Sequence, residues 1–449
     1  MAASPIAVYH DCLTPPIAAD TAEQLDRQLR ARRLVFGDRA LCTVLRPRLI
    51  TVEQLSGLQR RIRAILRAFR TAHDRAMRDA PFRAHFGLEA WEEELIQADP
   101  GFAEPSPTSR LDFFWVPETN ALGLTEYNAE TPAGAAYNDQ LAEAFLDLPA
   151  MRAFARKYEL LPLPARAGVI GALLDAHAEF AGTRTRPRVA ILDWDDVPTR
   201  AEFDLYQRAF AALGIHCAIA DPRACEYRGG RLWLEGAPVD LIYKRVLITE
   251  LVNRCGLAHD VVRAVRERAV CMVDGFRCKI LHKKASLAVL SDEANAGMFD
   301  DNERAAIADC IPWTRVVEER RSTYDGRPID LIPFIHEKRE QLVLKPSDAY
   351  GGEGVVLGWK SDAATWDAAV KTALGAPHIA QERVAIPSEP YPSWVDDKLE
   401  IYDRMLDTAP FVTHGDYMDG MLTRLSTAAL LNVTAGGGST VPTFVVIPR

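Results

Sequence analysis

The spacing of hydrophobic residues changes along the chain, and each spacing predicts a different kind of element. Over residues 51–79, apolar side chains recur every three or four positions, which predicts an amphipathic helix. Thr51 and Gln54 form a capping-box pattern at its start, and its arginines lie mostly off the apolar stripe, on a face expected to be solvated. Residues 99–110 are dense in Pro and Ser, which predicts a loop. Residues 1–110 are therefore expected to form a mainly helical N-terminal region.

The middle of the chain alternates short apolar runs with helical patterns. Strands are expected at 111–117, 121–130, 188–194, 215–220 and 239–245, and helices near 138–158 and 200–213. The run at 188–194 is continuously apolar, which is typical of a buried parallel strand. Because strand, helix and strand follow one another there, residues 161–250 are expected to form a small doubly wound α/β domain.

The last part of the chain predicts a sheet-rich unit. Its pattern is helical over 255–320, and short strands are expected at 340–346, 354–359, 378–384, 399–406, 410–414 and 430–434, with a helix near 362–373. Together these elements predict a mixed α/β (α+β) fold with several domains.

Composition narrows the classes of function. The chain has 449 residues with 53 Lys and Arg against 62 Asp and Glu, a net charge of -9, which argues against sequence-independent nucleic-acid binding. No apolar run reaches the roughly 18 residues of a membrane span, and the N-terminus lacks a signal-peptide pattern, so we expect a cytoplasmic protein without membrane contact. The eight cysteines include no C-x-x-C pair and are expected to be free thiols.

A glycine-rich loop is the strongest local signal. In VLKPSDAYGGEGVVLGW, Lys345 ends a strand, and Gly351, Gly352 and Gly354 follow before the next strand. Backbone N–H groups of such a loop can approach a polyphosphate closely, and the lysine can add a point charge. The alternative is a hairpin with ordinary turn glycines. The chain contains neither a Walker A loop nor a dinucleotide-binding fingerprint.

A second signal lies in RLDFFWVPETNALGLTEYNAETPAG. Arg110 and Asp112 share one face of a strand, and Glu126 and Asn128 share one face of the next. If these strands pair, Asp112, Glu126 and Asn128 form the all-oxygen set that Mg²⁺ prefers, and Arg110 faces the terminal phosphate. The alternative is an exposed polar face of an edge hairpin.

Two further pieces are ambiguous by themselves. One of Lys279, Lys283 and Lys284 could reach the α- and β-phosphates, although surface lysines are common. Gln381 and Glu382 end or flank a strand and could bind an adenine and a ribose, or they could face solvent.

Taken together and in this order, the pieces resemble the ATP-grasp superfamily, in its circularly permuted branch of glutathionylspermidine synthase-like proteins. The matching motifs are R-x-D, then E-x-N within EYNAETP, then HKKASLAVLSDEA, VLKPSDAYGGEG and IAQERV. The acid-x-Asn motif precedes both lysines, whereas it comes last in ordinary ATP-grasp proteins, and the resemblance spans about residues 110–434.

The resemblance implies a fold and a reaction. Two α+β subdomains would clamp ATP beside a small preATP-grasp-like domain, with residues 111–160 as the permuted metal-binding part of the core and residues 251–449 as the lid and remaining core. A carboxylate would attack the γ-phosphate to give an acyl phosphate, and an amine would then displace phosphate to form an amide. The substrates would be a small-molecule or peptide carboxylate and an amine, with ATP and Mg²⁺ as cofactors.

The family's roles transfer residue by residue. Asp112, Glu126 and Asn128 would hold Mg²⁺, and Arg110 would act on the transferring phosphoryl group. The ATP-binding roles would fall to Lys284, Lys345, Gly351, Gly352, Gly354, Gln381 and Glu382. Arg424 and Arg277 are weaker candidates for a substrate and a phosphate ligand.

The chain also departs from the family. Glu130 replaces an aspartate, and the residues before Arg110 are expected to leave no room for the amidase domain of the bifunctional relatives and show no Cys/His signature for one. Glutathione and spermidine are therefore not expected as substrates. Leu430 stands where a metal carboxylate would precede Asn432, so the metal is assigned to residues 112–128. A small-molecule kinase and a non-catalytic nucleotide-binding scaffold remain alternatives.

Overall fold

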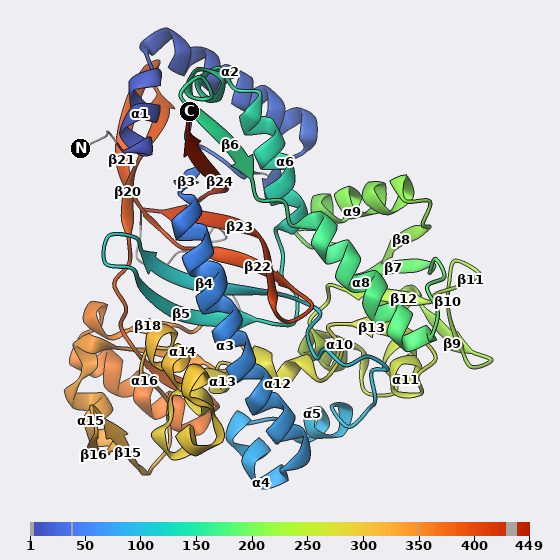
Figure 1. Ribbon diagram of the computed structural model, residues 1–449. Helices are drawn as coiled ribbons and strands as arrows, with labels where there is room; N and C mark the ends of the chain where they lie inside the picture. Colours follow the sequence, from blue (N-terminus) through green and yellow to red (C-terminus); the bar gives the residue numbers. More distant parts are fainter. Residues whose placement is uncertain (1–3, 37–38, 350, 428–437) are drawn as a thin grey trace.

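A nine-stranded sheet crosses the middle of the computed structural model, which describes residues 4–36, 39–349, 351–427 and 438–449 (Figure 1). Its main path runs β20-β21-β23-β22-β4-β5, and β24 joins β23 to β3 and β6. The strands are β3 (Arg48–Ile50), β4 (Thr108–Val116), β5 (Ala121–Asn128), β6 (Tyr158–Pro162), β20 (Ser388–Val395), β21 (Lys398–Leu406), β22 (Ala409–Thr413), β23 (Tyr417–Ser426) and β24 (Ser439–Pro448). Strands from both halves of the chain therefore share one sheet.

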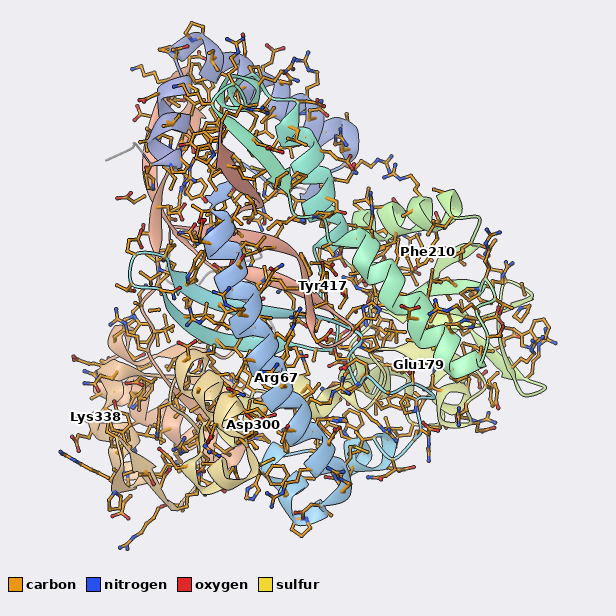
Figure 2. The ribbon with its side chains drawn as sticks, in the orientation of Figure 1. Arg67, Glu179, Phe210, Asp300, Lys338 and Tyr417 are labelled. Atoms are coloured by element: carbon orange, nitrogen blue, oxygen red, sulfur yellow. The ribbon has the colours of Figure 1, made fainter. Side chains whose placement is uncertain are left out.

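The long helix α3 (Val52–Arg78) packs along one face of this sheet, as Figure 1 shows. Its capping box is present at Thr51, and its apolar stripe joins a core with Phe113 and Leu124 of the sheet. Arg67 is exposed on the opposite face (Figure 2). The helix predicted over residues 51–79 is confirmed.

Other helices of the N-terminal region are α1 (Pro5–Cys12), α2 (Pro15–Arg32), α4 (Ala80–Arg83) and α5 (Ala90–Leu95), with a small ribbon of β1 (Val35–Phe36) and β2 (Arg39–Ala40). They pack in different places: α1 and α2 lie near the ends of the central sheet, α4 packs on α3, and α5 contributes Leu95 to the core of the small α/β unit. None of the helices in the described ranges combines the length and apolar character that crossing a bilayer requires. All eight cysteines are free, as predicted.

A parallel four-stranded sheet with the order β13-β12-β7-β8 forms the small α/β unit. Its strands are β7 (Val189–Leu192), β8 (Cys217–Ala220), β12 (Leu241–Lys244) and β13 (Cys271–Val273). Around it lie α8 (Arg166–Ala181), α9 (Arg200–Ala212), α10 (Ile248–Cys255), α11 (Asp260–Arg266) and a meander of β9 (Glu226–Arg228), β10 (Arg231–Leu234) and β11 (Ala237–Pro238). The predicted βαβ arrangement is confirmed.

A third sheet, ordered β14-β19-β17-β18, forms the unit that we call the lid. Its strands are β14 (Thr314–Val316), β17 (Leu342–Pro346), β18 (Val356–Leu357) and β19 (His378–Glu382), with α15 (Leu331–Glu337), α16 (Ala363–Gly375) and the hairpin of β15 (Arg321–Tyr324) and β16 (Arg327–Asp330). Between the lid and the central sheet lie α12 (Cys278–His282), α13 (Ala285–Ser291) and α14 (Asp301–Cys310).

Several predicted boundaries are wrong. The helix expected over 138–158 is two helices, α6 (Ala135–Leu146) and α7 (Pro149–Phe154), because proline starts a helix readily but does not continue one. The stretch 255–320 is not helical throughout, since β13 and β14 are short buried strands within it. The loop at 99–110 ends earlier, where β4 begins, and the strand expected at 354–359 is only β18 followed by a 3₁₀ turn. The strand predicted at 430–434 lies outside the described residues.

Candidate functional site

The hairpin of β4 and β5 brings the predicted polar residues onto one face. Arg110 pairs with Asn128, and Asp112 pairs with Glu126, in an antiparallel register that shifts just after Asp112. The strand pairing that the metal hypothesis needs is therefore present.

One cavity of about 630 Å³ gathers residues from the nine-stranded sheet, from the lid sheet and from the segments that follow β7 and β12 of the small α/β unit. The predicted residues that line it are Arg110, Asp112, Glu126, Asn128, Lys284, Lys345, Gly351, Gly352, Gln381 and Glu382. Gly354 is not among the lining residues; its φ is +69°, and a Cβ atom there would lie 2.6 Å from Cγ of Pro346. Residues that are more than 200 positions apart thus surround one space.

Asp112 lies at the centre of a buried charge cluster. Arg110 donates from Nε to Oδ1 at 2.7 Å, and Arg424 donates from Nη2 to Oδ2 at 2.7 Å. Burial alone would raise the pKa of Asp112, but the two guanidinium groups outweigh it and hold that pKa well below its usual range. Arg424 also binds Asp407, at 2.6 Å from Nε to Oδ2. Two cations thus neutralise two carboxylates beside the cavity.

Lys284 links the hairpin to the start of the glycine-rich segment. Its Nζ atom lies 3.2 Å from Oε1 of Glu126 and donates to the carbonyl oxygen of Ala349 at 2.6 Å. Burial opposes ionisation of Glu126, yet the nearby Lys284 keeps the pKa of that carboxyl below its ordinary value. Of the three candidate lysines, Lys284 alone lines the cavity in the described part of the chain.

Lys345 is buried on the lid side, and its hydrogen-bond acceptors are uncharged groups. Its Nζ atom donates to Oε1 of Gln381 at 2.7 Å and to the carbonyl oxygen of Thr125 at 3.1 Å. Burial, assisted by the charge of Lys284, lowers the pKa of Lys345 to about 7. The amide nitrogen of Gln381 donates to Oγ1 of Thr314 at 3.0 Å. Gln381 therefore holds Lys345 in place. Both the oxygen and the nitrogen of the Gln381 amide are hydrogen-bonded to other groups of the protein.

The lid end of the cavity is apolar. Phe114, Val343, Leu357, Val384 and Ile386 line it, together with Trp359, whose ring lies 4.5 Å from the guanidinium carbon of Arg383. Glu382 accepts a hydrogen bond from the hydroxyl of Tyr324 at 2.8 Å. This end can hold a flat, largely apolar group with one polar edge.

The opposite end is built by the small α/β unit and was missed by the sequence analysis. Asp193 follows β7 and Arg245 follows β12, and both line the cavity with Trp194, Asp196, Glu250 and Arg254. Burial raises the pKa of Asp193 to about 6. Ligands of open α/β sheets bind outside the carboxyl ends of the strands, so the positions after residues 192 and 244 were the signal that could have found this end.

Comparison with known proteins identifies the fold. No protein-family model and no curated protein matches the sequence. A solved structure of a glutathione synthetase-like effector (GSS30) from Globodera pallida, in its apo form, matches with a TM-score of 0.60 and 11% identity, over 96% of this chain and 98% of that one. D-alanyl-alanine synthetase A from Vibrio cholerae gives a TM-score of 0.27 at 9% identity, over 58% of this chain and 88% of that one, which is too low to bear on the fold. The chain thus has a mixed α/β, ATP-grasp-like fold, as predicted from its motifs.

Proposed function

We propose that this chain is an ATP- and Mg²⁺-dependent ligase that joins a carboxylate to an amine through an acyl phosphate, releasing ADP and phosphate. The observation that supports this most strongly is that two distant sets of side chains meet in one cavity. Asp112, Glu126 and Asn128 come from the β4–β5 hairpin, and Lys284 and Lys345 come from the segments before α13 and in β17. A metal-bound triphosphate requires both an oxygen ligand set and cations that neutralise its charge.

The nucleotide would lie with its base in the apolar lid end. Val343 and Leu357 would contact the base, and Glu382 would accept a hydrogen bond from the ribose. Lys284 and Lys345 would then reach the α- and β-phosphates. In this assignment Gln381 positions Lys345 and does not read the adenine, because its amide already binds protein groups.

The donor set fits Mg²⁺, because carboxylate and amide oxygens are its preferred protein ligands. Both oxygens of Asp112 accept hydrogen bonds from arginines, so at least one guanidinium group has to turn away to free an oxygen for the ion. When a guanidinium group turns away from Asp112, the terminal phosphate would give Arg110 or Arg424 a new anionic partner. When bound, the ion would neutralise phosphate charge, while both arginines stabilise the charge on the transferring phosphoryl group and the acyl phosphate.

The acid and the amine would enter from the small α/β unit. Arg254 offers a cation to a substrate carboxylate, and Asp193 and Glu250 offer carboxylates to an ammonium group. Gly351 and Gly352 line the cavity on the lid side, where their backbone can approach the phosphates and exclude water, because an acyl phosphate is otherwise lost to hydrolysis.

Product analysis with mixtures of carboxylates and amines tests the proposal. ADP and phosphate should form only when both substrates are present, and an amide should appear in equal amount. A stable phosphorylated product without an amide would overturn the ligase in favour of a kinase. Tight MgATP binding without turnover in any mixture would favour a scaffold instead.

A further inference from the structure

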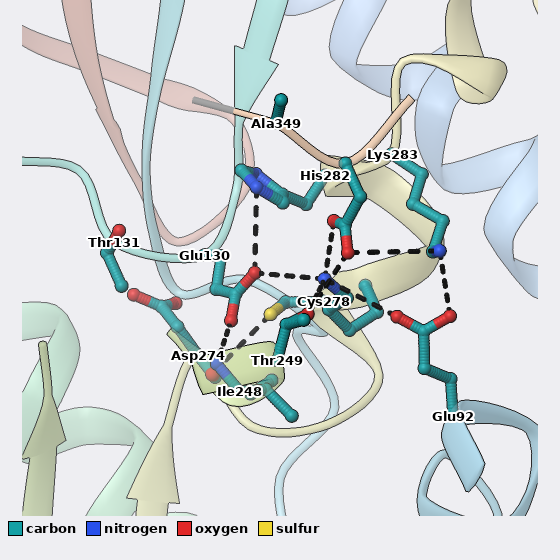
Figure 3. Close-up of polar contacts among 12 residues, drawn as sticks. Glu92, Glu130, Thr131, Ile248, Thr249, Asp274, Cys278, His282, Lys283 and Ala349 are labelled. Carbon is teal, nitrogen blue, oxygen red and sulfur yellow. Dashed lines mark hydrogen bonds and ion pairs between the residues drawn. The ribbon is translucent and has the colours of Figure 1, made fainter. Parts of the chain in front are cut away.

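A cluster of buried charges lies directly beside the candidate site, and the proposed reaction gives its members no role (Figure 3). The members are the lysines Lys244, Lys279 and Lys283 and the carboxylates Glu92, Glu130 and Asp348, with His282 at their edge. Apart from Asp348, whose side chain is 23% exposed, the charged groups are at most 2% exposed. Buried charges persist only where they are paired.

Lys279 occupies the centre of the cluster. Its Nζ atom lies 2.5 Å from Oδ1 of Asp348, 3.4 Å from Oε2 of Glu130 and 3.4 Å from Oε1 of Glu92, and it donates to Oγ1 of Thr249 at 3.1 Å. Three lysines balance three carboxylates. Oxygen and nitrogen atoms of Glu130, His282 and Asp348 lie close enough together to hold a metal, but the ammonium group of Lys279 already supplies a cation to two of them.

The pKa values of Glu130 and Asp348 agree with the ion pairs that these two carboxylates form. Burial works against the charged form of Glu130, but Lys279 and Lys244 outweigh it and lower the pKa of Glu130 to about 2. The pKa of Asp348 is lowered in the same way, with burial opposed by Lys279 and Lys283. Both carboxylates that contact Lys279 on the side of the cavity are therefore held in their charged form.

Three of the contacts of Lys279 are made to residues whose chain neighbours, Thr131, Glu250 and Ala349, line different parts of the cavity. Glu130 follows the β4–β5 hairpin two residues after Asn128, Thr249 lies in the first turn of α10 of the small α/β unit, and Asp348 stands just before the glycine-rich segment. Lys279 itself belongs to α12, which leads directly to Lys284. One ammonium group thus ties together the elements that surround the proposed triphosphate.

The start of the glycine-rich segment is docked on the same helices. The backbone N–H of Lys284 donates to the carbonyl oxygen of Ser347 at 2.8 Å, and the N–H of Ala285 donates to Oγ of Ser347 at 3.3 Å. Thr249 donates from Oγ1 to Oδ2 of Asp348 at 3.0 Å. Residues 347–349 are therefore held from two sides.

We infer that Lys279 and Asp348 are positioning residues: their buried ion pair fixes residues 347–349 against Lys284 and thereby sets the glycine-rich segment over the phosphate site. Neither residue lines the cavity in the described part of the chain, so each acts through its neighbours. The consequence for MgATP rests on the proposed function; the consequence for the segment itself does not.

The test compares Asp348→Asn with the wild-type protein in two measurements. Amide hydrogen exchange of the ligand-free protein should become about tenfold faster over residues 347–354, because an amide cannot replace the charge that holds the segment. The affinity for MgATP, measured by calorimetry, should fall by about 10- to 100-fold, the range expected when a distant change displaces a binding group. Asp367→Asn on α16 is the matched control, since Asp367 is exposed and its ion pair within the described part of the chain is with His336; it should change neither value.

Two substitutions of Lys279 show whether its positive charge or its size is needed for MgATP binding: Lys279→Arg keeps the charge, and Lys279→Met removes it. The arginine variant keeps a cation and should retain most of the MgATP affinity, whereas the methionine variant should lose it. If Asp348→Asn fails to fold, Thr249→Val is measured instead, because it removes hydrogen bonds to both Lys279 and Asp348 without removing a charge; faster exchange over 347–354 is expected there too.

The two measurements distinguish a failure of the positioning role from a failure of the proposed function. Unchanged exchange over residues 347–354 in a folded Asp348→Asn or Thr249→Val protein overturns the positioning role, whether or not nucleotide binds. Wild-type protein that does not bind MgATP overturns the proposed function, and the exchange measurement then decides the positioning role by itself.

Discussion

The ammonium group of Lys345 lies 2.7 Å from the side-chain oxygen of Gln381, which lies diagonally across the pairing of β17 with β19, opposite Val343. Both hydrogen-bond acceptors of Lys345, this amide and the carbonyl oxygen of Thr125, are uncharged. A buried lysine without a contacting carboxylate is costly to keep charged, and burial accordingly lowers its pKa to about 7. The ammonium group of Lys345 therefore has no contacting carboxylate among the described residues to balance its charge before an anionic ligand binds.

This arrangement predicts that MgATP affinity depends on pH. Phosphate oxygens near Lys345 should raise its pKa, so that above pH 7 the complex binds a proton which the free protein lacks. Affinity should be nearly constant below pH 7 and should fall by up to about tenfold per pH unit between pH 7 and 9. Calorimetry in buffers of different ionisation enthalpy measures both the affinity and the proton uptake.

Lys345→Met is the control for that profile. It should bind MgATP more weakly and should lose the proton uptake near pH 8. A wild-type affinity that stays constant from pH 7 to 9 would contradict the assignment of Lys345 to the phosphates.

The same substitution should stabilise the ligand-free protein. The pKa of Lys345 lies below its ordinary value of 10.5 in the folded state, so its burial penalises folding fully below pH 7 and progressively less as pH rises toward 10. Lys345→Met removes this penalty and should raise the free energy of unfolding at pH 7 by about 0.5–2 kcal/mol, the usual gain at a functionally strained position. Denaturant unfolding at pH 7 and pH 9.5 checks it: the gain should shrink at the higher pH.

The sequence could predict the short-range part of the site and not the long-range part. Asp112 and Glu126 are opposite one another because a short turn joins two alternating strands, and a hairpin register follows from local pattern. Arg424, which binds Asp112, is 312 residues away from it, and no local signal connects them. Its place depends on how β23 enters the central sheet, which is a property of the whole fold.

The sequence also could not tell which of three neighbouring lysines reaches the cavity. Lys279, Lys283 and Lys284 look alike in the sequence, and only the resemblance to a family singled out Lys284. In the structure all three are buried, but Lys279 and Lys283 face carboxylates within the protein while Lys284 reaches the cavity. Surface lysines were the simple expectation, and it was wrong because Glu92, Glu130 and Asp348, from three distant segments, supply the counter-charges.

Glu126→Gln should abolish turnover while the fold survives. The substitution keeps the size of the side chain and a hydrogen-bond acceptor for Lys284 but removes the charge of a proposed metal ligand. We expect kcat to fall by at least about 100-fold, comparable with the removal of one electrostatic group from an active site, with a melting temperature close to that of the wild type. Glu118→Gln, at the exposed turn of the same hairpin, should behave as wild type. Equal rates for the two variants would remove Glu126 from the metal site.

Gly354→Ala should weaken nucleotide binding although Gly354 does not line the cavity. Its φ of +69° is a left-handed conformation, and a Cβ atom would lie 2.6 Å from Cγ of Pro346, the residue after Lys345. Such a conformation costs an L-residue about 1–2 kcal/mol, and relief of the contact would shift the end of β17 that carries Lys345. We therefore expect both a lower melting temperature and weaker MgATP binding.

Gly375→Ala, at the end of α16, separates this local effect from a general effect of adding a methyl group. A Cβ atom at Gly375 meets nothing within 4 Å, so alanine there should be neutral or slightly stabilising, as expected for glycine replaced in a helix. Thermal unfolding and MgATP calorimetry on both variants give the answer. If Gly354→Ala matched Gly375→Ala in both measurements, the backbone at Gly354 would not need glycine, and Lys345 would not depend on the conformation of that residue.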